Sequence, residues 1–284
     1  MNIKLINTQK ALSPTQITLA DYCINPYRGC EFGCLYCYSL ENKNIKNAGS
    51  FGGIGVKVNI EEVLRRELKY TNPKRVLLGS TTECFQYAEL KYRLSEKVLN
   101  TLNEFNIPYT ILTKSHLIKE YLSLIAKNKQ NKIYFTLNCE QVKLLERKSP
   151  TQAQQLEAIK QIIKNNIALR IHIGPFIPYI SILKGLLEII PSGVKEVDIE
   201  LYHHKMGNFE EILKIMQNNL GMELKNKLSS VYETEASYLA FAKSLKADIT
   251  ALGGNFKDIS FFYIIPDFNM FYNKGINYHD KLES

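Results

Sequence analysis

The sequence has no apolar run long enough to cross a membrane and no recognisable export signal. Its longest apolar stretch, residues 171–191, is interrupted by a histidine, two prolines, a lysine and a glycine, whereas a membrane-spanning helix needs about 20 predominantly apolar residues. Residues 1–22 contain neither an apolar core nor a small-residue cleavage site, so they are not typical of a secretory signal. We therefore expect a cytoplasmic protein that makes no membrane contact.

Cysteine is also scarce, with six residues in a chain of 284. Cysteines in the cytoplasm stay reduced, so metal binding or catalysis is a better expectation for them than disulfides. Low-complexity segments and clear repeats are absent too, and 45% of the residues are hydrophobic. A chain of this length and composition can bury one large core or two modest ones.

Basic residues outnumber acidic ones, which gives a net charge of +8, and the excess falls within residues 1–200. A polyanion such as nucleic acid is therefore a permitted partner of that part of the chain. A solvated, lysine-rich surface explains the same charge equally well.

Runs typical of strands alternate with segments of helical apolar spacing along the middle of the chain. Strands are predicted at residues 75–79, 109–113, 132–137, 168–173 and 196–201, and helices at 60–71, 94–105, 117–125, 156–163, 182–189 and 209–220. Asn59 is the expected N-cap of the first helix. This alternation implies parallel pairing through right-handed crossovers. With one earlier strand it makes about six units, fewer than the eight of a closed barrel.

The predicted fold is therefore α/β, a partial (β/α)6 TIM-like barrel over residues 1–220 followed by a small C-terminal extension over residues 221–284. The extension is expected to hold a helix at 234–247 and a strand at 258–265 and to help close the barrel. Two barrel strands alternate apolar with charged residues: Arg170 and His172 on one, Asp198 and Glu200 on the other. If the apolar set faces the helices, this charged set lines a polar cavity inside the barrel. The alternative is a pair of edge strands with one wet face.

The strongest chemical signal is NPYRGCEFGCLYCYSL, in which Cys30, Cys34 and Cys37 have the spacing C-x3-C-x2-C. A glycine-bearing loop can curl around a cluster, so three thiolates this close can bind three irons of one 4Fe-4S cube. The fourth iron would then keep an open site for a substrate or cofactor. A structural zinc ion with Cys23 as its fourth ligand is the alternative.

This motif resembles the hallmark of the radical S-adenosylmethionine (SAM) superfamily, C-x3-C-x-aromatic-C, with Tyr36 as the aromatic residue. The longer string NPYRGC-x2-GC-x-YCY is similar to the spore photoproduct lyase-like branch. The resemblance continues through LLGSTTECFQYAELKYRLSEKVL, ILTKS and, more weakly, IGPFIP, and so covers about residues 22–205. It implies a 4Fe-4S cluster that binds SAM and cleaves it reductively to a 5'-deoxyadenosyl radical, which abstracts hydrogen from a substrate. An electron donor such as flavodoxin or ferredoxin is the implied partner.

The resemblance also implies a set of SAM-binding residues. Lys114, after the third predicted strand, is expected to contact the SAM carboxylate, and the loop after the second strand offers hydroxyls and a carboxylate to the ammonium group. Tyr36 is expected near the adenine, Asn138 toward the ribose, and His203 or His204 close to SAM, although a capped loop before the next helix explains the two histidines equally well. The predicted cofactor-binding set is Tyr36, Ser80, Thr81, Thr82, Glu83, Lys114, Asn138 and His203.

Two further residues are candidates for hydrogen-atom transfer. Tyr38, next to the last cysteine of the motif, is a candidate relay or packs beneath the cluster. In spore photoproduct lyase a cysteine at the start of the loop returns a hydrogen atom to the product, whereas this chain has Ser80 there, whose O-H bond is too strong for that role. Cys84 is a candidate substitute, with a buried structural thiol as the alternative.

The predicted function is therefore that of a radical SAM enzyme of the lyase or oxidoreductase type, acting on an unidentified substrate. A nucleic-acid lesion agrees with the basic charge, and a peptide or protein, as for an activase, is the alternative substrate. A non-catalytic iron-sulfur or zinc protein is a third possibility. Cys139 is the last cysteine, so no second cluster is predicted in the C-terminal region.

Overall fold

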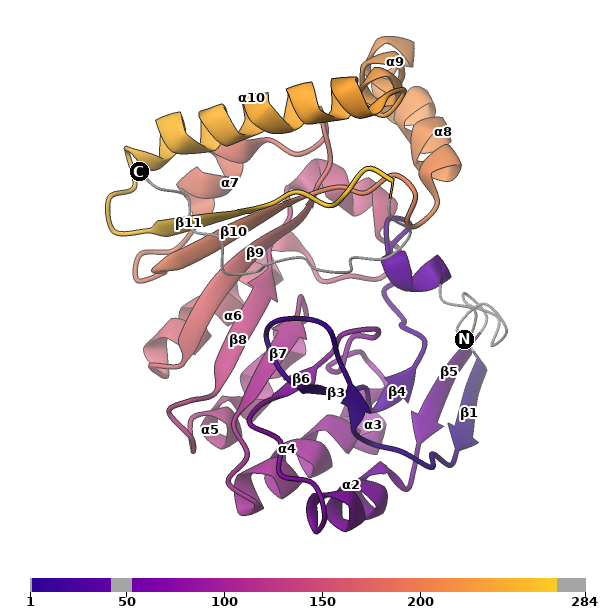
Figure 1. Ribbon diagram of the computed structural model, residues 1–284, viewed down its shortest axis with the longest axis vertical. Helices are drawn as coiled ribbons and strands as arrows, with labels where there is room; N and C mark the ends of the chain where they lie inside the picture. Colours follow the sequence, from indigo (N-terminus) through magenta and orange to yellow (C-terminus); the bar gives the residue numbers. More distant parts are fainter. Residues whose placement is uncertain (1, 42–52, 270–284) are drawn as a thin grey trace.

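The computed structural model describes residues 2–41 and 53–269, and its main element is a sheet of parallel strands (Figure 1). One short strand at the edge of this sheet is antiparallel to its neighbour. In spatial order the strands are β11 (Ser260–Ile264), β10 (Glu196–Leu201), β9 (Ala168–Phe176), β8 (Lys132–Thr136), β7 (Tyr109–Thr113), β6 (Val76–Leu78), β3 (Tyr22–Ile24) and the antiparallel β2 (Ser13–Pro14). Because neighbouring parallel strands need crossover connections, the order explains the regular alternation of strands and helices.

The predicted partial barrel is confirmed. The five strands expected between residues 75 and 201 correspond to β6 through β10, and β3 is the earlier strand that completes six units. The predicted C-terminal strand is β11, which pairs in parallel with β10. The extension therefore adds a strand to the barrel sheet itself.

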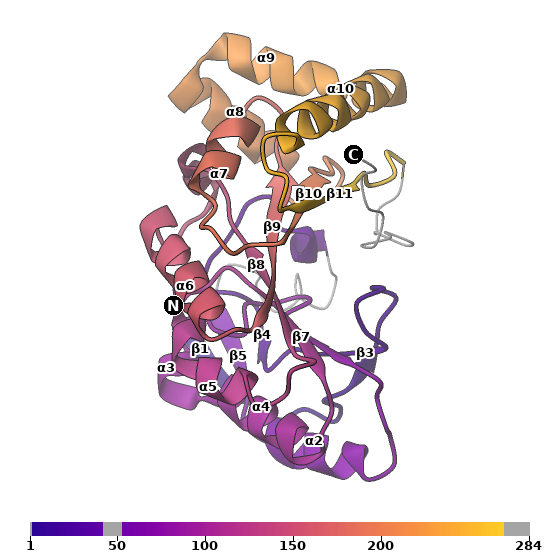
Figure 2. The ribbon, with the colours of Figure 1, turned by 90° about the vertical axis from the view of Figure 1, so that its left-hand side faces the viewer.

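Helices cover the outer face of this sheet (Figure 2). The helices of the described residues are α2 (Ile60–Leu68), α3 (Glu89–Tyr92), α4 (Leu94–Glu104), α5 (Leu122–Ile125), α6 (Gln152–Lys164), α7 (Leu183–Ile189), α8 (Phe209–Leu220), α9 (Met222–Val231) and α10 (Glu235–Gly253). There are also the 3-10 turns η1 (Tyr38–Glu41), which follows the cysteine loop, η2 (His116–Tyr121) and η3 (Glu140–Leu145). In Figure 1, α8, α9 and α10 lie at the end of the sheet formed by β10 and β11. No described helix is both long and apolar enough to span a membrane.

A second, smaller sheet is formed by strands that lie before and after β2 and β3 in the chain. It contains β1 (Asn2–Ile6) in parallel with β5 (Gly53–Lys57), and β4 (Tyr27–Arg28) antiparallel to β5. Asn59 stands at the N-cap of α2 as predicted, but its side chain makes no capping hydrogen bond. Instead the side chain accepts from the backbone N-H of Thr8 at 2.8 Å and donates to the Thr8 carbonyl at 3.0 Å, which ties the helix to the N-terminal segment.

The two faces of the barrel strands carry different residues. Ile171 and Ile173 on β9 and Val197 and Ile199 on β10 are fully buried in the core shared with the helices. The charged residues between them lie on the inner face, as the alternation predicted. Because β9 and β10 are each paired on both sides, the alternative that they are edge strands is wrong.

Candidate functional site

The carboxyl ends of the barrel strands surround a cavity of about 560 Å³. Its wall is formed by residues that follow β6 and β7, by the ends of β8, β9 and β10, and by the loop that carries Cys30, Cys34 and Cys37. Sites at this edge of a parallel barrel are built from several loops far apart in the sequence. The three cysteines and the loop after β6 are brought together here as predicted.

Main-chain hydrogen bonds hold the cysteine loop in place. Leu35 donates its N-H to the carbonyl of Leu145 at 2.9 Å, and the N-H of Asn208 donates to the carbonyl of Leu35 at 2.8 Å. On the other side, the N-H of Arg147 donates to the carbonyl of Phe32 at 3.0 Å. Two segments remote from the motif therefore fix the conformation of the loop between its cysteines.

Two glycines allow these close contacts. Gly33 has a φ of +59°, a left-handed conformation that costs glycine little. Gly207, in the segment after β10, has a φ of +77°, and a Cβ added to it would lie 2.7 Å from the carbonyl carbon of Tyr36. Only glycine lets this segment approach the backbone of the cysteine loop so closely.

Cys30, Cys34 and Cys37 all line the cavity, so the structure brings the three motif cysteines to one site. In the part of the chain that the structure describes, no three His, Cys, Asp or Glu side chains are placed to hold a single metal ion. A 4Fe-4S cube requires no such convergence, because each thiolate binds a different iron. Cys23 does not line the cavity and interacts with Ser80, so it does not complete a four-cysteine zinc site. The donor set fits a cube with one open iron.

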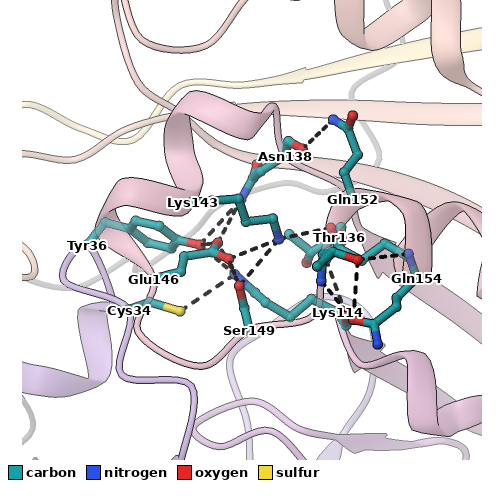
Figure 3. Close-up of polar contacts among 12 residues, drawn as sticks. Cys34, Tyr36, Lys114, Thr136, Asn138, Lys143, Glu146, Ser149, Gln152 and Gln154 are labelled. Carbon is teal, nitrogen blue, oxygen red and sulfur yellow. Dashed lines mark hydrogen bonds and ion pairs between the residues drawn. The ribbon is translucent and has the colours of Figure 1, made fainter. Parts of the chain in front are cut away.

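The ammonium group of Lys114 lies between the cysteine loop and a buried carboxylate (Figure 3). Its Nζ is 2.9 Å from Oε1 of Glu146 and 3.7 Å from Sγ of Cys34, and it also contacts the hydroxyl of Tyr36. Burial lowers the pKa of Lys114, but Cys34 and Glu146 outweigh this and raise the pKa above its usual range. Lys114 lines the cavity, as predicted, and is charged there.

Glu146, directly after η3, organises this corner of the site. Its side chain is fully buried, and it accepts from Lys114, from Lys143 Nζ at 3.1 Å, and from the hydroxyls of Tyr36 and Ser149. Burial raises the pKa of this carboxyl, but the two ammonium groups outweigh burial and hold the pKa well below its usual range. No motif marks this glutamate, so the sequence did not identify it.

Ser80, Thr81, Thr82 and Glu83 all line the cavity, in the loop after β6. The Thr82 hydroxyl donates to the carbonyl of Gly29, which joins this loop to the cysteine loop. Glu83 is buried, and its carboxylate accepts from backbone N-H groups of Phe85 at 2.9 Å and Lys114 at 3.0 Å and from the Thr113 hydroxyl at 2.7 Å. These bonds make Glu83 the link between the loops after β6 and β7.

The two tyrosines beside Cys37 have different surroundings. Tyr36 is buried, and its hydroxyl donates to Glu146. Tyr38 is 38% exposed on the cavity wall, and its hydroxyl donates to the backbone carbonyl of Ser80. Asn138 is buried next to Tyr36, with its Nδ2 at 3.3 Å from the Tyr36 hydroxyl, while its Oδ1 has no hydrogen-bond partner among the described residues.

The remaining sequence candidates differ in their access to the cavity. His203 lines it, and its Nε2-H donates to the carbonyl of Asp267 at 2.7 Å, which leaves a buried Nδ1 with no partner among the described residues. Cys84 is fully buried and is not part of the cavity wall. Cys139 is a core residue, as expected, and its thiol donates to the carbonyl of Ile180 at 3.3 Å.

Two residues on the inner face of the sheet also line the cavity, His172 on β9 and Glu200 on β10. The strand pattern predicted that they point inward, but they were not among the candidate site residues. Nδ1 of His172 is hydrogen-bonded to Asp198, which lies opposite it on β10.

A family model described as the radical SAM superfamily matches residues 24–182 of the chain. An uncharacterized protein of Methanocaldococcus jannaschii is 28% identical over 186 residues, which cover 63% of this chain and 70% of that protein. An uncharacterized protein of Mycobacterium tuberculosis is 30% identical over 172 residues, covering 56% of this chain and 51% of that protein. The match thus spans only about half the length of the mycobacterial relative.

Solved structures of spore photoproduct lyase resemble this structure over most of its length. A single-residue variant of that enzyme has a TM-score of 0.68 at 16% sequence identity, covering 92% of this chain and 81% of that chain. The lyase complexed with dinucleoside spore photoproduct has a TM-score of 0.66 at 15% identity, with the same coverage. At this level of identity the likeness is one of fold.

Proposed function

Because the chain belongs to the radical SAM superfamily, whose members are enzymes that use a 4Fe-4S cluster and SAM, we propose that Cys30, Cys34 and Cys37 hold such a cluster at the cavity. When bound there, a cluster reduced by one electron from an external donor would cleave SAM to methionine and a 5'-deoxyadenosyl radical, which would abstract a hydrogen atom from the substrate. The observation that carries this proposal is that the three motif cysteines and Lys114 all line the same cavity. We further propose that SAM occupies the part of the cavity next to these residues.

The polar residues around the cysteine loop are suited to the charged ends of SAM. Lys114 presents an ammonium group for its carboxylate, and the loop of Ser80 through Glu83 presents hydroxyls and a carboxylate for its amino group. The side chains of Lys114, Thr82 and Glu83 are already fixed by hydrogen bonds within the protein, so SAM would meet oriented groups. The unpartnered Nδ1 of His203, a residue of the cavity wall, is an acceptor that suits a hydroxyl group of the ribose, whereas Asn138 is buried and is not part of the cavity wall.

For the substrate we propose a nucleic-acid lesion, because the fold is shared with an enzyme whose structure was determined with dinucleoside spore photoproduct. Tyr38 is our candidate for the hydrogen-atom relay, since it is exposed on the cavity wall beside Cys37. Cys84, also proposed from the sequence, would need the loop after β6 to move, because its thiol is fully buried. A peptide or protein is the alternative substrate.

The first experiment tests the cluster and the cleavage of SAM. The protein is purified and reconstituted without oxygen, its iron and sulfide are quantified, and 5'-deoxyadenosine is measured after addition of dithionite and SAM. We expect about four irons and four sulfides per chain and cluster-dependent 5'-deoxyadenosine. Cys34→Ala should lose both, whereas Cys139→Ala, a core cysteine outside the cavity, should keep both. Full iron content in Cys34→Ala, or a colourless wild-type protein with one zinc ion, would contradict the proposal.

A second experiment tests Lys114 as a ligand of SAM. Lys114→Met should keep the cluster but weaken SAM binding by about 1.5–3 kcal/mol, or about 10- to 150-fold, because a charged hydrogen bond is lost. Lys143→Met is the matched control, since it removes the other ammonium group from Glu146 but does not line the cavity. Equal SAM affinity in the two variants, measured by anaerobic equilibrium dialysis, would show that Lys114 only supports Glu146.

A further inference from the structure

His172, Asp198 and Glu200 form a cluster on the inner wall of the barrel that the proposed chemistry does not use. His172 and Asp198 are directly opposite each other on the paired strands β9 and β10. His172 and Glu200 line the cavity, whereas Asp198 is fully buried behind them. The three residues thus place one imidazole between two carboxylates on a rigid part of the sheet.

The orientation of the imidazole is fixed from two sides. Nδ1 of His172 is hydrogen-bonded to Oδ2 of Asp198, so the other ring nitrogen, Nε2, is turned away from that carboxylate. Two residues further along β9, Gly174 lies against the ring. A Cβ added to Gly174 would lie 1.8 Å from Nε2, so the absence of a side chain at this glycine makes room for the ring. Oδ1 of Asp198 is buried without a hydrogen-bond partner among the described residues. The hydrogen bond at Nδ1 sets the orientation of the ring and thereby the direction of Nε2.

The second ring nitrogen of His172, Nε2, lies beside Glu200. Nε2 of His172 and Oε2 of Glu200 are 3.6 Å apart, which is longer than a normal hydrogen bond. A nitrogen donor and a carboxylate acceptor therefore stand next to each other at the cavity surface. A ligand that offers an acceptor to the first and a donor to the second would contact both.

Charge at this wall restricts the ligand further. Burial lowers the pKa of His172, and Lys114 lowers it too, but Asp198 and Glu200 raise it by more, so the pKa is above its usual value and favours a proton on Nε2. Of these charged groups, Lys114 directly follows β7, and Asp198 and Glu200 lie on β10. One imidazolium between two carboxylates disfavours an anion such as phosphate. The protonated ring in turn repels a cationic ligand, and its Nε2-H requires a hydrogen-bond acceptor on the ligand.

We propose that His172 and Glu200 form a substrate-binding subsite for a neutral group that carries a hydrogen-bond acceptor next to a donor, as an amide or imide does, with Asp198 as the positioning residue of His172. The inference rests on the proposed function, because it assigns this cluster to the substrate and the residues beside the cysteine loop to SAM. The subsite predicts that the substrate contains a neutral polar group. This prediction does not depend on which larger molecule carries that group.

The test observes the imidazole directly in the cluster-reconstituted protein labelled with 15N-histidine. The chain has five histidines, so the 15N signals of His172 can be assigned by their loss in His172→Gln, or by their perturbation in Glu200→Gln if the first variant does not fold. The probes are uracil as an imide, N-methylacetamide as an amide, methylguanidinium, inorganic phosphate, and SAM. Because the readout needs no cleavage of SAM, it can fail independently of the proposed function.

We expect uracil or N-methylacetamide to shift the His172 signals with saturation, and Glu200→Gln to weaken that binding at least 10-fold. Glu188→Gln, at an exposed position on α7, is the control and should bind like the wild type. The stronger of the two amide probes indicates whether a ring imide or an open amide is preferred. No shift with either probe, tighter binding of phosphate or methylguanidinium, or the same saturable shift with SAM alone would overturn the proposal.

Discussion

Replacing Glu146 by glutamine is the most direct test of the charge arrangement beside the cysteine loop. Glutamine keeps the shape of the side chain but removes the charge that balances Lys114 and Lys143, whose side chains are only 13% and 16% exposed. Removing one partner of a buried ion pair costs about 3–5 kcal/mol, because the remaining charge stays buried without a counterion. Some solvent reaches both lysines, so we expect the lower end, about 3 kcal/mol.

Thermal unfolding of the anaerobic, reconstituted protein measures this effect. For a chain of this size, about 3 kcal/mol corresponds to a fall in Tm of about 6 °C. The control is Glu104→Gln, which removes an ion pair with Arg65 from the surface, where the Glu104 side chain is 55% exposed. Ion pairs at such positions contribute little, so the control should keep the wild-type Tm. An equal Tm for both variants would refute the assignment of Glu146 as the charge that holds the two lysines.

The pH dependence of this difference provides a second check. The folded-state pKa of Glu146 lies below its usual value of 4.5, so its stabilising contribution is fully present above that pH and is lost as the pH falls through the folded-state pKa. The Tm gap between wild type and Glu146→Gln should therefore be the same at pH 8 and pH 6. A gap that disappears between pH 8 and pH 6 would show that another group is responsible.

Two further predictions concern the loop after β10 and the inner wall. Gly207→Ala should destabilise the protein more than Gly221→Ala. Both glycines have positive φ, and this conformation costs alanine about 1–3 kcal/mol at either position. At Gly207 the added Cβ also meets the backbone of Tyr36, and this overpacking adds about 1–3 kcal/mol. Equal changes in Tm would contradict this contact. Asp198→Asn should lower the pKa of His172, because a raising charge is lost; a 15N pH titration in which the wild-type pKa is not above 6.5, or does not fall in the variant, would exclude the ion pair.

The fold was predictable because its signals are local and repeated. The apolar residues of β9 and β10 alternate with charged ones, and that alternation gave both the parallel strands and the inward direction of His172 and Glu200. The cysteine ligands were predictable for the same reason, since their spacing lies within one loop. Element ends were less accurate: α10 continues to Gly253, past the predicted end at residue 247, because buried Ile249 still packs into the core.

The contacts that hold the site residues in place were not predictable, because they join segments that are far apart in the sequence. Glu146 is 32 residues from Lys114 and 110 from Tyr36, and nothing in its surrounding sequence differs from an ordinary surface turn. At Asn59, distant contacts instead prevent a local interaction that the sequence predicts. The position of Asn59 before a helix predicts a cap, but tertiary contacts with Thr8 take its side chain instead.

The cysteine loop shows how these two levels combine. The motif fixes which side chains can bind the cluster, while backbone hydrogen bonds to Leu145 and Asn208 fix where those side chains lie. Because both contacts to Leu35 use main-chain atoms, they place few demands on side-chain identity, apart from the glycines that the loop conformation and the close approach require at positions 33 and 207. A search for this site in other chains should therefore combine the cysteine spacing with a glycine after the sixth barrel strand. Chains that have the cysteine spacing but lack this glycine would need other contacts to hold the cysteine loop in place.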